Sequence, residues 1–318
     1  MKKSCHKLAA LLLTAAMVVV LAGLLPSSVS ANPGLEVGGA LLMADVSPGQ
    51  ILAWPISVSI SKTDPATNIV VQVMGMTESP DGVHEELAVS DDTGPFSARS
   101  FISIDNSSFH LDPGASETVN ADIQVPQNVG DGGRYAMINI SEQSANGSGV
   151  QTVAAVDVQV ALTIKGSQLI HTGKITGLSA SVVTGQPINI LTDFQNTGNH
   201  HFDVQGEVTI KNAKGQTIGT IAIPLTTSSI LPGTARQLKS TLTTKSRLAP
   251  GTYTIDSKIM LEDGTLLDET TNTFGLTTQY VPPTSSGINW VMIGIIAAAV
   301  IIFGVIAVYI LRSRRRKA

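Results

Sequence analysis

The sequence predicts an all-β protein, and three observations support this fold class. Aromatic residues make up only 4% of the chain, whereas glycine occurs 29 times. Several stretches between residues 32 and 287 alternate apolar and polar residues with a period of two, as half-buried strands do. No stretch in that range shows the period of 3.6 residues that an amphipathic helix requires.

The first 31 residues have the composition of a signal peptide. Three lysines precede an apolar run from Leu8 to Leu25, and small residues end the segment at Ala31. We therefore expect cleavage after Ala31, with a retained first helix as the alternative. The single cysteine, Cys5, lies in this segment, so the mature chain has none. An exported protein without disulfides suits a bacterial or archaeal surface.

The other end of the chain predicts a membrane anchor. Residues 288–311 form an uncharged apolar run, and residues 312–318 form a basic tail. A helix of this length spans a hydrocarbon core of about 30 Å, and the basic tail stays in the cytoplasm. We expect a single-pass cell-membrane protein with its N-terminus outside. The alternative, a buried core helix, would need a polar face or a covering domain.

Alternating strands fall into two series. In the first series the apolar faces are Trp54, Ile56, Val58 and Ile60; Val119, Ala121, Ile123 and Val125; and Val156, Val158, Val160, Leu162 and Ile164. In the second series they include Ile188 and Ile190; Phe202, Val204, Val208 and Ile210; and Tyr253, Ile255, Ile259 and Leu261. Pro55 lacks a backbone donor, so its strand should lie at an edge or begin irregularly.

The two series follow one plan. Gly49-Gln50 and Gly185-Gln186 open the first long strand of each series, and a Pro-Gly turn precedes a tyrosine by 21 residues after Gly114 and by 20 after Gly233. This repeat predicts two tandem immunoglobulin-like β-sandwiches, at residues 32–165 and 166–276. Residues 277–287 would then be a juxtamembrane linker.

The first series contains about 17 additional residues, which fall at Thr77 to Arg99. We expect this segment to be an exposed excursion that the core does not need. Its carboxylates are candidates for binding a partner or a cation such as calcium, although their spacing is not that of an EF-hand. The candidate residues are Asp81, Glu85, Glu86, Asp91 and Asp92.

Charge limits the partners of the exported segment. Residues 32–287 hold 12 basic and 24 acidic residues, a formal charge of −12, and residues 35–165 alone hold 4 basic and 16 acidic residues. Such a surface argues against nucleic acid and favours cations or a basic partner. Plain solubility is the alternative explanation of this charge.

The sequence does not predict an enzyme. It has no cysteine nucleophile in the mature chain, no Gly-x-Ser-x-Gly and no His-Glu-x-x-His. The pair His200-His201 follows a turn, and adjacent strand residues point to opposite faces, so we expect a solvated turn and no metal site there. Calcium is the one cofactor that the sequence leaves open.

One motif bears on anchoring. Before the membrane helix stand Val281, Pro282, Pro283, Thr284 and Ser285. This order resembles the Leu-Pro-x-Thr-Gly head of a cell-wall sorting signal, but valine replaces leucine and serine replaces glycine. A proline-stiffened linker is the alternative.

The layout as a whole resembles the WxL-interacting surface proteins of Gram-positive bacteria. The resemblance rests on the signal segment, Ser47-Pro48-Gly49-Gln50, Leu111-Asp112-Pro113-Gly114, a second sandwich and the Arg-rich tail after one membrane helix. It implies that the first domain contacts peptidoglycan and the second a host ligand, with a WxL protein bound alongside.

Together these features predict a non-enzymatic surface protein for binding or scaffolding. Its expected partners are a cell-wall polymer or another envelope protein. The alternative is an accessory subunit that positions an envelope enzyme or transporter.

The predicted topology has a direct test. Protease added to intact cells should remove nearly all of the protein's mass, because everything before residue 288 is expected outside. Immunoblotting for a C-terminal tag measures the remnant. A remnant of full length, under conditions that degrade other surface proteins, would contradict the topology.

Overall fold

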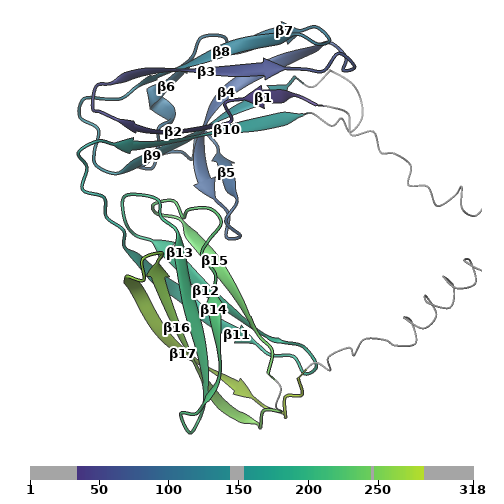
Figure 1. The fold of residues 1–318 in the computed structure, drawn as a ribbon, viewed down its shortest axis with the longest axis vertical. Helices are drawn as coiled ribbons and strands as arrows, with labels where there is room; N and C mark the ends of the chain where they lie inside the picture. Colours follow the sequence, from purple (N-terminus) through teal and green to yellow (C-terminus); the bar gives the residue numbers. More distant parts are fainter. Residues whose placement is uncertain (1–33, 144–153, 245–246, 283–318) are drawn as a thin grey trace, which may run out of the picture. The chain divides into compact units, whose positions relative to one another are not determined.

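The computed structural model describes residues 34–143, 154–244 and 247–282, and this part of the chain forms two compact units (Figure 1). The first unit takes in the described residues up to Thr172 and the loops Asn196–Phe202 and Ile230–Thr234, and the second unit takes in the other described residues. No helix within the described ranges is long and apolar enough to cross a membrane. The predicted signal peptide, membrane helix and basic tail lie outside these ranges.

The first unit consists of two sheets. Its strands are β1 (Glu36–Gly38), β2 (Leu41–Val46), β3 (Ile51–Ser59), β4 (Thr67–Glu78), β5 (His84–Leu87), β6 (Ile102–Ile104), β7 (Ser108–Leu111), β8 (Ser116–Gln124), β9 (Gly133–Glu142) and β10 (Ala155–Ile164), with a 3-10 helix η1 at Arg99–Phe101. One sheet has the order β1-β3-β8-β6, and the other has the order β2-β10-β9-β4-β5, with β7 also paired to β4.

The second unit also consists of two sheets. Its strands are β11 (Gly173–Ser181), β12 (Ile188–Asn196), β13 (Val204–Asn212), β14 (Thr217–Ile223), β15 (Ala235–Leu242), β16 (Gly251–Leu261) and β17 (Leu266–Leu276). The sheet orders are β11-β12-β15 and β14-β13-β16-β17. The described chain is therefore all-β, as predicted, and its paired sheets are consistent with immunoglobulin-like sandwiches.

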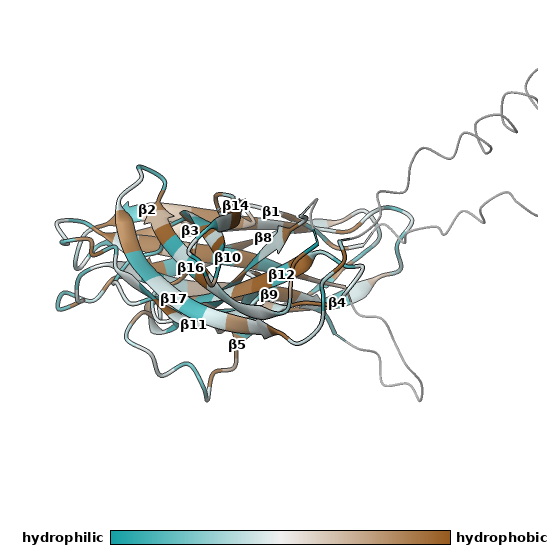
Figure 2. Ribbon diagram, turned by 90° about the horizontal axis from the view of Figure 1, so that it is seen from below, coloured by the Kyte–Doolittle hydropathy of each residue, from teal (hydrophilic) through white to brown (hydrophobic). Residues whose placement is uncertain are grey.

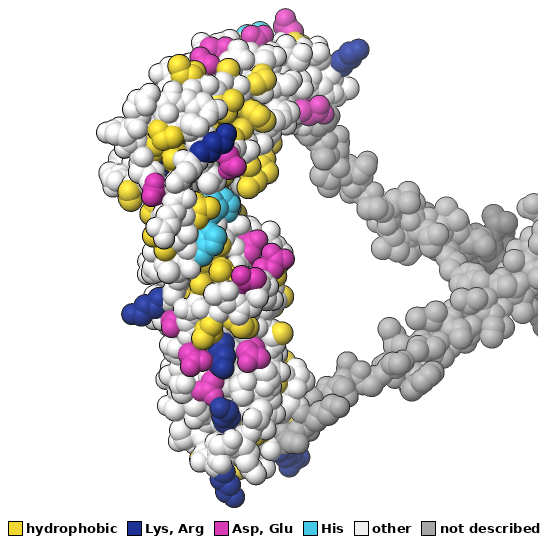
Figure 3. All heavy atoms as spheres, turned by 60° about the vertical axis from the view of Figure 1, so that its left-hand side comes forward, with side chains coloured by type: hydrophobic (Ala, Val, Ile, Leu, Met, Phe, Trp, Pro, Cys, Tyr) yellow, Lys and Arg dark blue, Asp and Glu magenta, His cyan; other side chains and the backbone are white. Residues whose placement is uncertain are grey.

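Hydrophobic and hydrophilic residues alternate along several strands (Figure 2), as expected where one face of a sheet packs on a core. The space-filling view shows acidic, basic and scattered hydrophobic side chains on the outside (Figure 3). The predicted inward faces are confirmed: Ile56 and Val58 on β3, Val119 and Ile123 on β8, and Val158 on β10 are fully buried.

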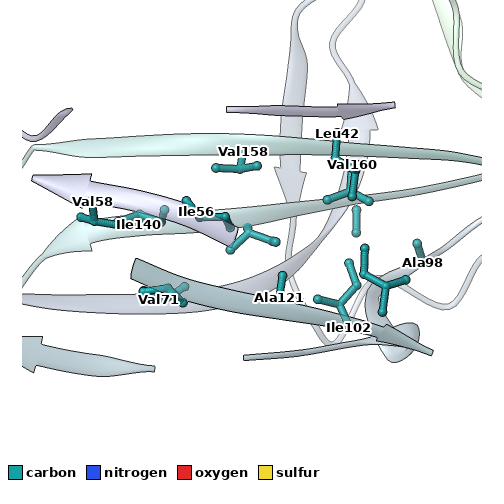
Figure 4. Packing of buried hydrophobic residues seen from close by; sticks show 14 of the residues in the cluster. Leu42, Ile56, Val58, Val71, Ala98, Ile102, Ala121, Ile140, Val158 and Val160 are labelled. Atoms are coloured by element: carbon teal, nitrogen blue, oxygen red, sulfur yellow. The ribbon is translucent and has the colours of Figure 1, made fainter. Parts of the chain in front are cut away.

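The core of the first unit fills the space between its two sheets. Ile56 and Val58 of one sheet lie opposite Ile140 and Val158 of the other (Figure 4). The sheet spacing of about 10 Å leaves room for one interdigitated layer from each side. Pro55 lies where β3 pairs with β8, while β1 covers only Ser57–Ser59, so the proline has a strand neighbour on one side.

In the second unit, the core includes one polar pair. The hydroxyls of Thr192 on β12 and Ser257 on β16 lie 3.1 Å apart, and both residues are fully buried. Because each hydroxyl has the other as partner, their burial carries no unsatisfied group. The pair explains why the period of two in β16 continues through a serine.

The repeated turns have the same geometry in both series. Gly49 and Gly185 have φ of +76° and +80°, and each turn is closed by the amide of the following glutamine at 3.0 Å. Gly114 and Gly233 have φ of +76° and +82° in the two Pro-Gly turns. Only glycine adopts this region without strain, which is the physical basis of the repeat.

Burial of Ile140 should contribute to the stability of the first unit. We expect Ile140→Ala to lower its free energy of unfolding by about 2 to 5 kcal/mol, since Ile140 is fully buried. The matched control, Ile51→Ala, should change it by less than about 0.5 kcal/mol because Ile51 is 71% exposed. Urea unfolding followed by Trp54 fluorescence measures both. Equal losses would contradict this assignment of the core.

Candidate functional site

The acidic insertion begins as a hairpin. Strand β4 pairs with β9 only as far as Met74, and then continues to pair with β5, from Gly75 opposite Leu87 to Glu78 opposite His84. Gly82, with φ of +86°, turns the chain between the two strands. We call residues 75–87 the acidic hairpin. In Figure 1, β5 and the end of β4 form a two-stranded ribbon that leaves the sandwich strands.

The acidic hairpin contacts the outer face of β10. His84 Nδ1 lies 3.2 Å from Gln159 Oε1, and Glu86 interacts with the carboxyl group of Asp157. Burial, followed by hydrogen bonding to and repulsion from Asp157, raises the pKa of Glu86 above its usual value. A side-chain hydrogen bond from Asn139 to Glu86 partly offsets this rise, and Asn139 Nδ2 also donates a hydrogen bond of 3.0 Å to Asp157 Oδ1.

The buried side chain of Asp92 holds the C-terminal part of the insertion in place through hydrogen bonds. Its side chain is only 5% exposed and accepts hydrogen bonds from Ser97 Oγ at 2.5 Å and from Arg99 Nε at 3.0 Å. Gly75 makes room for it, because a Cβ added at that position would lie 2.5 Å from Asp92 Cγ. The structure thus places Asp92 as a structural acceptor, whereas the sequence had suggested a ligand group.

The end of the insertion belongs to the sandwich. Ala98 is fully buried in the core, and its amide donates to the carbonyl of Tyr135 on β9 at 2.8 Å. The amide of Tyr135 in turn donates to the carbonyl of Phe96 at 2.8 Å. Strand β4 pairs with β9 only as far as Met74, opposite Met137. Beyond that point, Ser97 pairs with Tyr135 of β9. The prediction that all of residues 77–99 form an exposed excursion is therefore wrong, because Ala98 and Glu78 are buried and the side chain of Asp92 is only 5% exposed.

The remaining predicted acids are exposed. Asp81 lies in the turn of the hairpin, Glu85 on β5, and Asp91 in the loop that follows. In the described ranges, no three histidine, cysteine, aspartate or glutamate side chains gather as they would around a metal ion. The five predicted acids thus divide into an exposed set, a carboxyl pair and a buried acceptor, and do not form one cluster.

Only the start of the predicted sorting motif lies in the described part of the chain. The carbonyl of Val281 accepts a hydrogen bond of 2.8 Å from the amide of Gly185. Tyr280 is 1% exposed, and its hydroxyl donates to the carbonyl of Gln186 at 2.7 Å. The second unit therefore includes residues that were predicted to be linker. Pro283, Thr284 and Ser285 lie outside the described residues.

The turn with the histidine pair is better ordered than expected. Asn196 Nδ2 donates to the carbonyl of His200 at 2.9 Å, and the rings of His200 and His201 stack with centroids 4.1 Å apart. Both rings are half-buried, and burial is the main cause that lowers the pKa of His200. A fully solvated turn was therefore the wrong expectation.

Loss of the buried acceptor should loosen the insertion. We expect Asp92→Ala to lower the free energy of unfolding by about 2 to 3 kcal/mol, because two hydrogen bonds to a carboxylate are lost and Arg99 loses its partner. The neighbouring control, Asp91→Ala, is exposed and should cost less than about 0.5 kcal/mol. Urea unfolding measures both, and equal effects would refute the structural role of Asp92.

Comparison with known proteins gives a likeness of fold alone. No protein-family model matches the sequence, and no curated protein is similar to it. The class 5 fimbriae chaperone CfaA is 11% identical, with 78% of this chain and 100% of that chain covered and a TM-score of 0.36. A chain of a chaperone–tip adhesin complex of CFA/I fimbriae is 11% identical, with 77% and 99% covered and a TM-score of 0.38. A PapD-like domain of human CEP192 is 9% identical, with 45% and 93% covered and a TM-score of 0.31. The likeness is distant and is to immunoglobulin-like β-sandwiches.

Proposed function

We propose that the protein is a non-enzymatic, membrane-anchored surface protein for binding or scaffolding, whose first sandwich contacts a cell-wall polymer or another envelope protein. The observation that carries this proposal is the acidic hairpin. It occurs in the first of the two units, with Glu85 on strand β5 and Asp81 in the turn between β4 and β5. Loops and hairpins on a rigid scaffold are where binding residues collect.

The hairpin combines a fixed position with an open charged surface. Strand pairing to β4 and the contact of His84 with Gln159 hold it in place. Asp81, Glu85 and Asp91 are exposed. Because the site is already ordered, a partner does not have to order it on binding, which lowers the entropic cost of association.

Charge supports a partner that presents cationic groups. The first series has 16 acidic and 4 basic residues, and two of those bases are engaged. Arg99 bonds to Asp92, and Arg134 is buried and donates to the carbonyls of Gly130, Asp131 and Gly133. The acidic groups of the first unit therefore have little internal compensation. The resemblance to WxL-interacting proteins supports the same proposal.

The second candidate is an accessory subunit that positions an envelope enzyme or transporter. Two β-sandwiches that hold a neighbouring protein in place would serve that role equally well. A wall binder sediments with purified peptidoglycan when it is alone, whereas an accessory subunit is recovered only with its protein neighbour.

The proposal predicts that hairpin charge controls association. We expect the detergent-solubilised full chain to bind purified peptidoglycan or a protein of the solubilised envelope. Neutralising two acids of the hairpin and one acid of the loop that follows it should weaken binding at low salt, and the loss should shrink at high salt because exposed charges are screened within about 8 to 10 Å. The variant is Asp81→Asn, Glu85→Gln and Asp91→Asn.

A control with the same change in net charge separates location from total charge. Asp112, Glu117 and Asp131 are exposed acids of the same unit outside the hairpin. The control variant is Asp112→Asn, Glu117→Gln and Asp131→Asn. Equal weakening by both variants would remove the hairpin from the proposal. Failure to bind either wall material or any envelope protein would refute the proposed function itself.

A further inference from the structure

Strand β2 forms an open end of a sheet in the first unit. It is six residues long and pairs in parallel with β10, from Leu41 opposite Gln159 to Val46 opposite Ile164. No strand within the described ranges pairs with its other side. A sheet edge of this kind is a template for the addition of another strand.

The backbone groups at this edge belong to three residues. The carbonyl of Ala40 accepts from the amide of Gln159 at 3.1 Å, and that of Val46 accepts from Lys165 at 2.8 Å. In a parallel ladder, alternate residues direct both N–H and C=O to the same neighbour. The even-numbered residues of β2 therefore bond to β10, and Leu41, Met43 and Asp45 direct both groups away from it. We call these three residues the free edge.

The side chains of the free edge are exposed as well. Leu41 is 55% exposed and Met43 is 61% exposed. Leu42 and Val46, which point to the other face of β2, are buried. Hydrophobic side chains that reach the surface are visible in the space-filling view (Figure 3). Two large apolar side chains at alternate positions would lie against the side chains of an added strand.

Some other end strands are short, or have backbone groups that are bonded by side chains. In the first unit, β1 and β6 have three residues each. In the second unit, Asp268 on β17 accepts from the amide of Ile175 on β11 at 2.7 Å, and Asn272 donates to the carbonyl of Leu178. These side chains satisfy backbone groups of β11. The strand β2 contains no proline and no lysine, and its pairing with β10 has no bulge, so Asp45 is its one charged side chain against strand addition.

We infer that the free edge binds an extended segment of a partner protein, which pairs with β2 as an additional strand and carries apolar and basic residues on the same face. The apolar residues would contact Leu41 and Met43, and the basic ones would meet the acids nearby. This inference rests on the proposed binding function and specifies the class of partner, since a polysaccharide cannot supply a ladder of amides and carbonyls.

Charge selects this occupant over a second copy of the chain. Asp45 lies on the free edge, Asp157 lies on the outer face of β10, and Glu85 and Glu86 lie on the hairpin that contacts that strand. A second copy would bring the same acidic groups to the contact, and like charges across strands are unfavourable. A basic strand would compensate them.

The test uses the detergent-solubilised full chain and a fluorescent nine-residue peptide, Thr-Lys-Thr-Val-Thr-Val-Thr-Lys-Thr, whose valines and lysines share one face of the extended strand. A second peptide has the same side chains but is N-methylated at alternate residues, so that it cannot donate hydrogen bonds along one side. Fluorescence anisotropy should show that the N-methylated peptide binds at least about tenfold more weakly, because several backbone hydrogen bonds are lost.

Two variants at one position separate backbone from side chain. Met43→Pro removes an outward N–H and leaves the bonds of β2 to β10 in place, and it should weaken peptide binding about tenfold or more. Met43→Ala keeps the N–H and loses only apolar contact, so we expect about a threefold to fivefold loss. If Met43→Pro does not fold, the pair of peptides still decides the question on the wild-type chain.

Several results would overturn the inference. One is equal binding of both peptides, or no binding of either; another is Met43→Pro binding as well as Met43→Ala. Dimerisation of the wild-type chain that Met43→Pro abolishes would identify a second copy as the occupant. Slow hydrogen exchange at the amides of Leu41, Met43 and Asp45 in the free protein would show that the chain covers its own edge. If the chain binds the peptide but no envelope component, the inference that the free edge accepts a strand stands and the proposed function is refuted.

Discussion

Burial of alternate side chains between two facing sheets is the interaction on which both units depend. The mature chain as predicted has no cysteine, so no disulfide shares in holding the sheets together. Apolar burial contributes about 25 cal/mol per Å² and must offset the entropy of ordering every strand. The strict period of two along β3, β8 and β10 follows from this requirement, because one shifted residue would turn a whole apolar face to water.

A sandwich also has to deal with the backbone groups at its sheet edges, and the two units do so differently. In the second unit, side chains of β17 reach the backbone of β11. In the first unit, the chain changes sheets at Gly39, so that β1 joins β3 and β2 joins β10. The change of sheet closes one side of the sandwich. It leaves the backbone N–H and C=O groups on the outer edge of β2 without a strand partner in the described ranges. The acidic hairpin contacts the neighbouring strand β10, so charge and an open edge occur in the same part of this unit.

Much of the fold was predictable from the sequence because its signals are local. Periodicity identified the inward faces, and glycines with positive φ identified the repeated turns. The parallel pairing of β2 with β10 was not predictable, since it joins residues more than a hundred positions apart and a short apolar run carries no partner information. The same holds for Ala98 and Asp92. Their segment has no period, and their burial depends on Tyr135 and Gly75, which come from other strands. In the candidate site, the acidic composition was foreseen, but the division into exposed, paired and buried carboxylates was set by tertiary contacts.

Because Asp92 lies close to Gly75 and bonds to Arg99, substitutions at positions 75, 92 and 99 depend on one another. A side chain at position 75 fits only after the carboxylate at position 92 has become smaller, and that change in turn leaves Arg99 without its acceptor. The order of substitutions therefore matters. A homologue with alanine at position 75 should also differ at positions 92 and 99, and sequences with only one of these changes should be rare. The surface of the hairpin faces no such restriction, so its charge can vary with the partner while its base stays the same.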